Sequence, residues 1–127
     1  MKPIILVVDD EDETRLMLRI LLELKGFQVE EAVDGLDALR KVGDINPDVM
    51  VLDVMMPELD GPSTLEELKK QFDLNDVMVI FMTAKVQQEE LAHFKAIGGF
   101  DVIEKPFDPM SLSDKIRASW DRFMDAK

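Results

Sequence analysis

Residues 47–57 read PDVMVLDVMMP and place one carboxylate at the end of an uninterrupted apolar run. A short apolar run between two prolines, here residues 49–52, predicts a strand that is covered on both faces, as the strands of parallel sheets are. Asp53 would then stand at the carboxyl end of that strand. Ligands of open α/β sheets bind at this edge, so Asp53 is a candidate functional residue.

Four further segments have strand character. Residues 4–8 and 77–82 are continuously apolar, whereas residues 27–30 and 100–104 mix apolar and polar side chains. Because continuously apolar strands are covered on both faces, we expect the first, third and fourth strands in the middle of the sheet. The second and fifth strands are expected at its edges.

Apolar residues at helical spacing follow the strands and predict five amphipathic helices. In the first helix, Leu16, Ile20 and Leu24 form one stripe that ends at a glycine, which is typical of a helix end. Asp108, just before Pro109, is the predicted N-cap of the last helix. The other predicted apolar faces are formed by Leu36, Leu39 and Val42; by Leu65, Leu68 and Phe72; by Leu91, Phe94 and Ile97; and by Leu112, Ile116 and Phe123.

Five strands that alternate with five helices predict an α/β fold with a doubly wound, five-stranded parallel sheet between two layers of helices. The placing of the apolar strands favours the flavodoxin-like order 2-1-3-4-5. The chain has no linker, repeat or low-complexity tract, and its 127 residues are 46% hydrophobic. We therefore expect one domain over residues 1–127.

The composition limits the classes of partner. With 27 acidic residues against 15 basic ones, the net charge is -12, which argues against binding to nucleic acid and favours proteins or cations. Cysteine is absent, so no disulfide or thiolate chemistry is expected, as in a reducing compartment. No stretch has the length of a membrane span. We expect a cytoplasmic protein without membrane contact.

Chemistry-bearing residues follow the ends of the predicted strands. In the predicted topology Asp9, Asp10, Asp53, Thr83 and Lys105 all emerge at the carboxyl edge of the sheet. Neighbouring carboxylates raise one another's pKa unless a cation joins them, and an all-oxygen site without His or Cys suits Mg²⁺ or Mn²⁺. The lysine and the threonine can bind a phosphoryl group, and an aspartate can accept one as an aspartyl-phosphate.

In these motifs the chain resembles the receiver domains of bacterial two-component response regulators, over essentially its whole length. The matching pieces are VVDDE at residues 7–11, LDVMMP at residues 52–57, Asp60-Gly61, MTA at residues 82–84 and KPF at residues 105–107. Each piece is weak alone, but the ordered set at this spacing is specific.

The resemblance implies a role for each site residue. Asp53 would be the phosphoacceptor. Asp10, Asp53 and the backbone carbonyl of Met55 would bind Mg²⁺ directly, and Asp9 would act through a metal-bound water. Thr83 and Lys105 would contact the phosphoryl oxygens.

The resemblance also implies that the Lys105-Pro106 bond is a cis peptide. Two further positions, Met55 and Lys85, would flank the path of the water that removes the phosphoryl group. Because Met55 cannot orient a water, we expect slow self-dephosphorylation.

Where the family commonly has Tyr or Phe as a moving aromatic switch, this chain has Val102, which has no ring and is stiff at χ1. A muted or differently routed switch is expected.

The resemblance implies a phosphodonor partner that is a sensor histidine kinase or a histidine phosphotransfer protein. A downstream protein would bind the face formed by the fourth helix, fifth strand and fifth helix. The protein is expected to be a stand-alone phosphoacceptor that promotes its own phosphorylation, rather than an enzyme; the alternative is one domain of a longer chain.

Two other functions remain open from the sequence. An Asp-nucleophile phosphatase would need an acid two residues after Asp53, where Met55 stands. A pseudo-receiver that serves only as a binding module would be favoured by loss of the acids or the lysine, and all of these are present.

Overall fold

The structure, a computed structural model, describes residues 2–84 and 86–127, and in these residues five strands alternate with five helices. The strands are β1 (Ile4–Val8), β2 (Gln28–Ala32), β3 (Val49–Asp53), β4 (Met78–Thr83) and β5 (Asp101–Glu104). The helices are α1 (Asp12–Leu24), α2 (Gly35–Ile45), α3 (Gly61–Gln71), α4 (Gln88–Ala96) and α5 (Pro109–Asp125). All the predicted elements are present.

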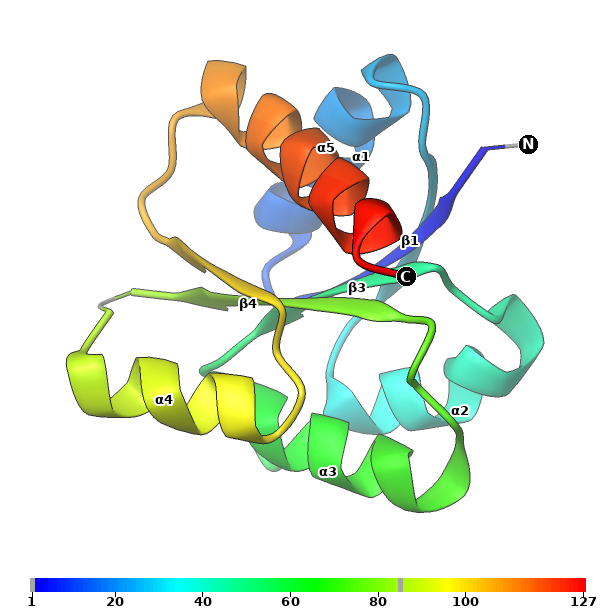
Figure 1. The fold of residues 1–127 in the computed structure, drawn as a ribbon, viewed down its shortest axis with the longest axis vertical. Helices are drawn as coiled ribbons and strands as arrows, with labels where there is room; N and C mark the ends of the chain where they lie inside the picture. Colours follow the sequence, from blue (N-terminus) through cyan, green and yellow to red (C-terminus); the bar gives the residue numbers. More distant parts are fainter. Residues whose placement is uncertain (1, 85) are drawn as a thin grey trace.

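The strands form one parallel sheet in the order β2-β1-β3-β4-β5, which confirms the predicted flavodoxin-like topology. The register brings the carboxyl ends of the strands level, since Val8 pairs with Leu52 and Asp53 pairs with Met82. Residues that leave the ends of β1, β3, β4 and β5 therefore meet at one edge of the sheet (Figure 1).

Helices cover both faces of the sheet. In Figure 1, α1 and α5 lie on one side and α2, α3 and α4 on the other. Alternate residues of β3 serve the two layers: Val49 and Val51 belong to the core beneath α1 and α5, whereas Met50 and Leu52 belong to the core beneath α2 to α4. This double burial explains why β3 is apolar at every position before Asp53.

Three helices begin at an aspartate that caps them. The side chains of Asp34, Asp60 and Asp108 each accept a hydrogen bond from a backbone N–H two or three residues further on. This satisfies one of the unpaired amides of the first helical turn. The predicted cap at Asp108 is confirmed, with Pro109 as the first residue of α5.

The predicted apolar stripe of α1 is wrong at its three main positions, whereas Met17 and Leu21, expected beside them, are half-buried. Leu16, Ile20 and Leu24 are 58%, 52% and 78% exposed. The buried face is instead formed by Arg15, Leu18 and Leu22. The two leucines belong to the core between the sheet and the layer of α1 and α5. Apolar residues occupy two sides of this helix, and the buried side includes an arginine, so periodicity alone selected the wrong side.

The predicted face of α2 is wrong at one position for the same kind of reason. Leu36 is 42% exposed, and the buried residues are Gly35, Asp37, Ala38 and Val42. The Asp37 carboxylate accepts a hydrogen bond from the backbone N–H of Val33 at 3.0 Å. A charged side chain thus occupies a buried position that the pattern assigned to a leucine.

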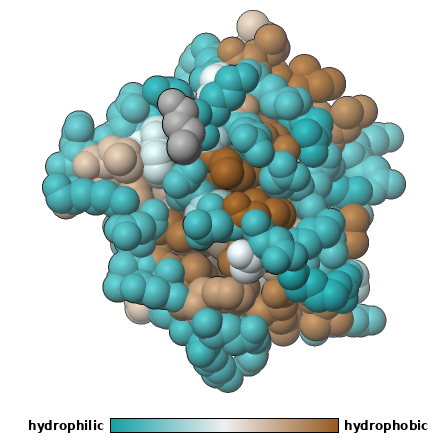
Figure 2. All heavy atoms as spheres, turned by 90° about the vertical axis from the view of Figure 1, so that its right-hand side faces the viewer, coloured by the Kyte–Doolittle hydropathy of each residue, from teal (hydrophilic) through white to brown (hydrophobic). Residues whose placement is uncertain are grey.

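Away from the site, the surface is mixed. Figure 2 views the molecule from the side where the strands begin and shows mostly hydrophilic side chains with smaller hydrophobic groups between them. Among residues 2–84 and 86–127, no helix combines the length and the apolar character that crossing a bilayer requires.

The two sides of α1 predict opposite effects of the same mutation. Leu22 is fully buried and Leu24 is 78% exposed, so Leu22→Ala should lower the free energy of unfolding by about 2–5 kcal/mol because it leaves a cavity. Leu24→Ala should change it by less than about 0.5 kcal/mol. Urea denaturation followed by circular dichroism measures both values, and equal losses would contradict the observed packing of α1.

Candidate functional site

Three carboxylates meet at the carboxyl edge of the sheet. Asp9 and Asp10 follow β1, and Asp53 ends the neighbouring strand β3. One carboxylate oxygen from each of the three lies within 4.8 Å of the others. Asp9 is fully buried and Asp53 is 5% exposed, while Asp10 reaches the surface. The sequence-predicted acids are therefore brought together.

Lys105 leaves the end of β5 and points into this cluster. Its Nζ lies 3.3 Å from Asp9 Oδ2 and 3.3 Å from Asp53 Oδ2. Glu11 lies further out, with 3.6 Å between its Oε1 and the same ammonium. The Lys105-Pro106 bond is cis, as the resemblance implied. The ammonium thus bridges the two buried carboxylates.

Burial dominates the electrostatics of the two buried acids. Desolvation and the nearby Asp9 raise the pKa of Asp53 to about 6, although Lys105 and a hydrogen bond from the backbone N–H of Met55 act to lower it. Burial also raises the pKa of Asp9, against hydrogen bonding from the Glu11 N–H and the charge of Lys105. Burial acts to lower the pKa of Lys105, but Asp9 and Asp53 outweigh it and raise this pKa.

Thr83 ends β4 beside the acidic cluster. The Asp53 position pairs with Met82 in the register, one residue before Thr83. Thr83 is 5% exposed, and its carbonyl accepts a hydrogen bond from the backbone N–H of Lys105 at 2.7 Å. The backbone thus ties the ends of β4 and β5 together next to Asp53.

The loop after Asp53 begins with an exposed side chain. Met55 is 74% exposed, and its backbone N–H donates to the Asp53 carboxylate. The other residue expected to flank the water path, Lys85, lies outside the described residues. The direct contact of the Met55 carbonyl with a metal stays a prediction.

Two contributors were not singled out from the sequence for these roles. The Glu11 backbone N–H donates to Asp9 Oδ1 at 2.8 Å and orients that carboxylate. Gly61 lies so close to β3 that a side-chain carbon there would stand 2.5 Å from the Asp53 carbonyl oxygen. Such a close backbone approach admits only glycine. In the sequence, Gly61 stood out only as part of the Asp60-Gly61 motif, and no role was assigned to it there.

The arrangement fits a small divalent cation. Magnesium prefers oxygen ligands, uses one or two carboxylates and keeps several waters. The cluster offers oxygens from three carboxylates, one of them exposed, and within the described part of the chain a single lysine ammonium lies between the two buried acids. Desolvated carboxylates with raised pKa values gain from a cation that they can share. Asp9, Asp10 and Asp53 are therefore suited to hold Mg²⁺.

An acidic pocket with a lysine and a threonine, at the carboxyl edge of a 2-1-3-4-5 sheet, defines a class of phosphoryl-receiving proteins. The family described as the response regulator receiver domain matches residues 5–117. The protein belongs to this family, whose members are phosphoacceptor signalling domains of two-component systems and bind Mg²⁺ through an acidic pocket.

Individual relatives agree with this assignment. The chain is 41% identical over 104 residues to the regulatory protein AtoC of Escherichia coli, covering 82% of this chain and 22% of AtoC. It is 39% identical over 114 residues to the CpxR homolog of Haemophilus influenzae, a transcriptional regulatory protein, covering 90% of this chain and 48% of that relative. The chemotaxis protein CheY4 of Vibrio cholerae superposes with a TM-score of 0.87 at 28% identity, over 94% of this chain and 99% of CheY4.

The chain spans about half the length, or less, of these curated relatives. Regulation of transcription is therefore a property of those longer proteins. The expectation that this chain does not bind nucleic acid stays a prediction.

The raised pKa of Asp53 predicts a pH-dependent cost of keeping this acid ionised. Its ordinary value is 3.8 and its value in the folded protein is about 6, so between these values the folded protein holds a proton that the unfolded chain has released. The free energy of unfolding then falls as the pH rises through this window. In metal-free buffer, Asp53→Asn should add about 1–3 kcal/mol of stability near pH 7.5 and much less near pH 4.5.

Urea denaturation at both pH values measures the difference. Asp44→Asn, at an exposed position of α2, is the matched control and should have little effect at either pH. A loss of stability in Asp53→Asn near pH 7.5 would contradict the raised pKa.

Proposed function

We propose that Asp53 accepts a phosphoryl group from the phosphohistidine of a partner, in a Mg²⁺-dependent step that the receiver itself promotes. The partner is a sensor histidine kinase or a histidine phosphotransfer protein. The observation that carries the proposal is the Asp53 carboxylate, which is 5% exposed, lies 3.3 Å from Lys105 and shares a cluster with two further carboxylates.

The chemistry requires an ionised, positioned nucleophile. With a pKa of about 6, Asp53 is largely ionised at neutral pH and is a stronger base than an ordinary aspartate. A carboxylate oxygen attacks phosphorus in line, the P–N bond to the donor imidazole breaks, and the imidazole leaves with the bonding electron pair. Mg²⁺ would be held by Asp10, Asp53 and the carbonyl of Met55, and by Asp9 through a water, and it would supply charge neutralisation for the transferred group.

Lys105 and Thr83 stabilise the negative charge of the phosphoryl group on Asp53. The Lys105 ammonium, now between Asp9 and Asp53, turns to the phosphoryl oxygens, and the Thr83 hydroxyl donates a hydrogen bond to them. An open depression of about 450 Å³ beside Lys105 gives a donor room to approach; it is lined by Thr14, Met17, Ala84, Lys105, Pro106 and Phe107.

Phosphorylation then changes a partner-binding face. The group adds about -1.5 to -2 charge units, and the hydrogen bond between the Thr83 carbonyl and the Lys105 N–H links both phosphate-binding residues through the backbone. Movement of this pair biases the face formed by α4, β5 and α5, which binds a downstream protein. We place this signalling in the cytoplasm, without membrane contact.

The alternative functions gain no support from the site. A phosphatase needs an acid two residues after Asp53 to protonate the leaving group, and that position is the exposed Met55. A pseudo-receiver lacks part of the acidic cluster or the lysine, whereas here Asp9, Asp53 and Lys105 are in contact.

The acceptor can be identified by labelling. Incubation with Mg²⁺ and acetyl phosphate should give one acyl-phosphate, detected by intact mass and by its lability to hydroxylamine, because Asp53 is the buried, ionised nucleophile of the site. Asp53→Asn should abolish it and the exposed Asp44→Asn should keep it. Absence of label on the unmodified protein would reject the proposal.

The same labelled protein tests the expected slow dephosphorylation. After removal of the donor, the acyl-phosphate should persist well beyond seconds, because Met55 offers no group that orients the attacking water. A lifetime of only seconds would contradict this part of the proposal.

We expect little change at Val102 when the receiver is activated. This residue is half-buried, pairs with Phe81 of β4 and packs against the core beneath α2 to α4, and its stiff side chain has no ring to turn. Beryllofluoride with Mg²⁺, a mimic of the phosphoryl group, should change hydrogen exchange around Thr83 and leave the Val102 amide nearly unchanged. A large change in hydrogen exchange centred on Val102 would contradict the expectation that the switch is muted or differently routed.

A further inference from the structure

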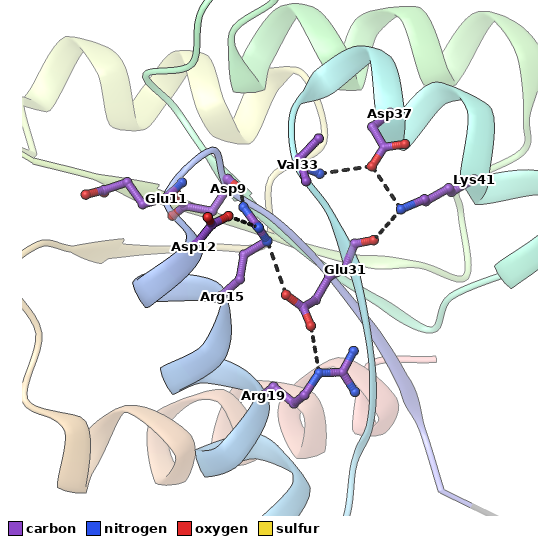
Figure 3. A network of polar contacts seen from close by, with 9 residues as sticks. All are labelled: Asp9, Glu11, Asp12, Arg15, Arg19, Glu31, Val33, Asp37 and Lys41. Atoms are coloured by element: carbon purple, nitrogen blue, oxygen red, sulfur yellow. Dashed lines mark hydrogen bonds and ion pairs between the residues drawn. The ribbon is translucent and has the colours of Figure 1, made fainter.

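Arg15 is a buried cation directly behind the acidic cluster. It lies in the first turns of α1 and is 8% exposed. Arginine is rarely buried to this degree unless its donors are paired. Figure 3 shows its guanidinium among the residues that follow β1 and the side chain of Glu31 on β2. The proposed phosphoryl transfer does not use it directly.

The guanidinium donates to three partners. Nη1 donates to the backbone carbonyl oxygen of Asp9 at 2.7 Å, Nε donates to Glu31 Oε1 at 3.1 Å, and Nη2 pairs with the Asp12 carboxylate. Burial acts to lower the pKa of Arg15, but the pairs with Asp12 and Glu31 outweigh it and raise this pKa. Arg15 therefore stays charged and oriented.

The contact with the carbonyl fixes the peptide between the two aspartates. On the other side of Asp9, its backbone N–H donates to the Ala32 carbonyl of β2 at 3.2 Å. Because a peptide unit is planar, holding the Asp9 carbonyl sets the plane from which the Asp10 backbone leaves. The directions of both carboxylates depend on that plane.

Glu31 anchors the guanidinium from the edge of the sheet. Its second oxygen accepts from Arg19 Nε at 2.7 Å, and its backbone carbonyl accepts from Lys41 Nζ at 3.0 Å. Lys41 in turn pairs with Asp37 at 2.9 Å. Figure 3 shows this chain of contacts running from Asp9 to α2. The strand position that carries Glu31 is thus held by Lys41 and by the pairing with Val7 of β1, independently of Arg19.

We propose that Arg15 is a positioning residue for the metal site: it holds the Asp9 carbonyl so that the Asp9 and Asp10 carboxylates face a bound cation. This inference rests on the proposed Mg²⁺ site and adds a residue from outside the motifs that define it. Lysine cannot replace arginine in this role, because a point ammonium does not reproduce a fork that serves the Asp9 carbonyl and Glu31 together.

Arg19 provides a matched control. It shares Glu31 with Arg15 and lies one turn further along α1, but its described contacts are with Glu23 and Glu31 and not with Asp9. Arg15→Lys and Arg19→Lys keep the same net charge, so the long-range attraction for a cation is equal in both. The stronger pair, Arg15→Met and Arg19→Met, removes the charge at both positions.

The test measures the Mg²⁺ dissociation constant by calorimetry and the melting temperature of the metal-free protein. Arg15→Lys should weaken Mg²⁺ binding about 10-fold, as loss of a group that orients a metal ligand does, and Arg19→Lys should stay within about 2-fold of the unmodified protein. Arg15→Met should weaken it further. If the methionine variant fails to fold, the lysine pair decides.

The outcomes separate this inference from the function on which it rests. Equal Mg²⁺ affinity in Arg15→Lys and Arg19→Lys overturns the positioning role, even if Arg15→Lys melts at a lower temperature, because that result describes a purely structural arginine. Absence of Mg²⁺ binding by the unmodified protein overturns the metal site and the inference together. Labelling of Asp53 with normal Mg²⁺ binding, but without the difference between the two lysine variants, leaves the proposed function intact and rejects only Arg15.

Discussion

The contact of one ammonium with two buried carboxylates is the interaction on which the site depends. Lys105 lies 3.3 Å from both Asp9 and Asp53, yet the pKa of Asp53 is still raised to about 6. Burial and the charge of Asp9 thus outweigh Lys105 in setting this pKa. Among the described residues, three carboxylates meet one lysine at this edge, and a divalent cation can neutralise the excess negative charge.

The sheet makes this contact possible by bringing distant segments to one edge. Lys105 and Asp9 are 96 positions apart in sequence and hydrogen-bonded in space. Parallel pairing in register brings the strand ends level, and the double burial of β3 keeps Asp53 at the boundary between core and solvent. Burial at this boundary is the largest cause of the raised pKa of Asp53, ahead of its charged neighbours.

The strands and the acidic edge were predictable because each depends on a local pattern. Continuous apolar runs define β1, β3 and β4, and the first polar residue after each run is a predicted site residue. The buried faces of α1 and α2 were not predictable, because Arg15 and Asp37 occupy buried positions there. What makes those positions suitable for charge is a partner from another segment: Glu31 for Arg15 and Val33 for Asp37. Pairing across segments leaves no periodicity in the sequence.

In the loop between β3 and α3, one position tolerates substitution and another, a few residues away, does not. At Gly61 even a methyl group would collide with the Asp53 carbonyl, so substitution there disturbs the backbone of the proposed acceptor. Met55 points into solvent and is 74% exposed, so its side chain can change without cost to the fold. A substitution at Met55 can therefore change how long the proposed phosphoryl group persists without disturbing the backbone next to Asp53.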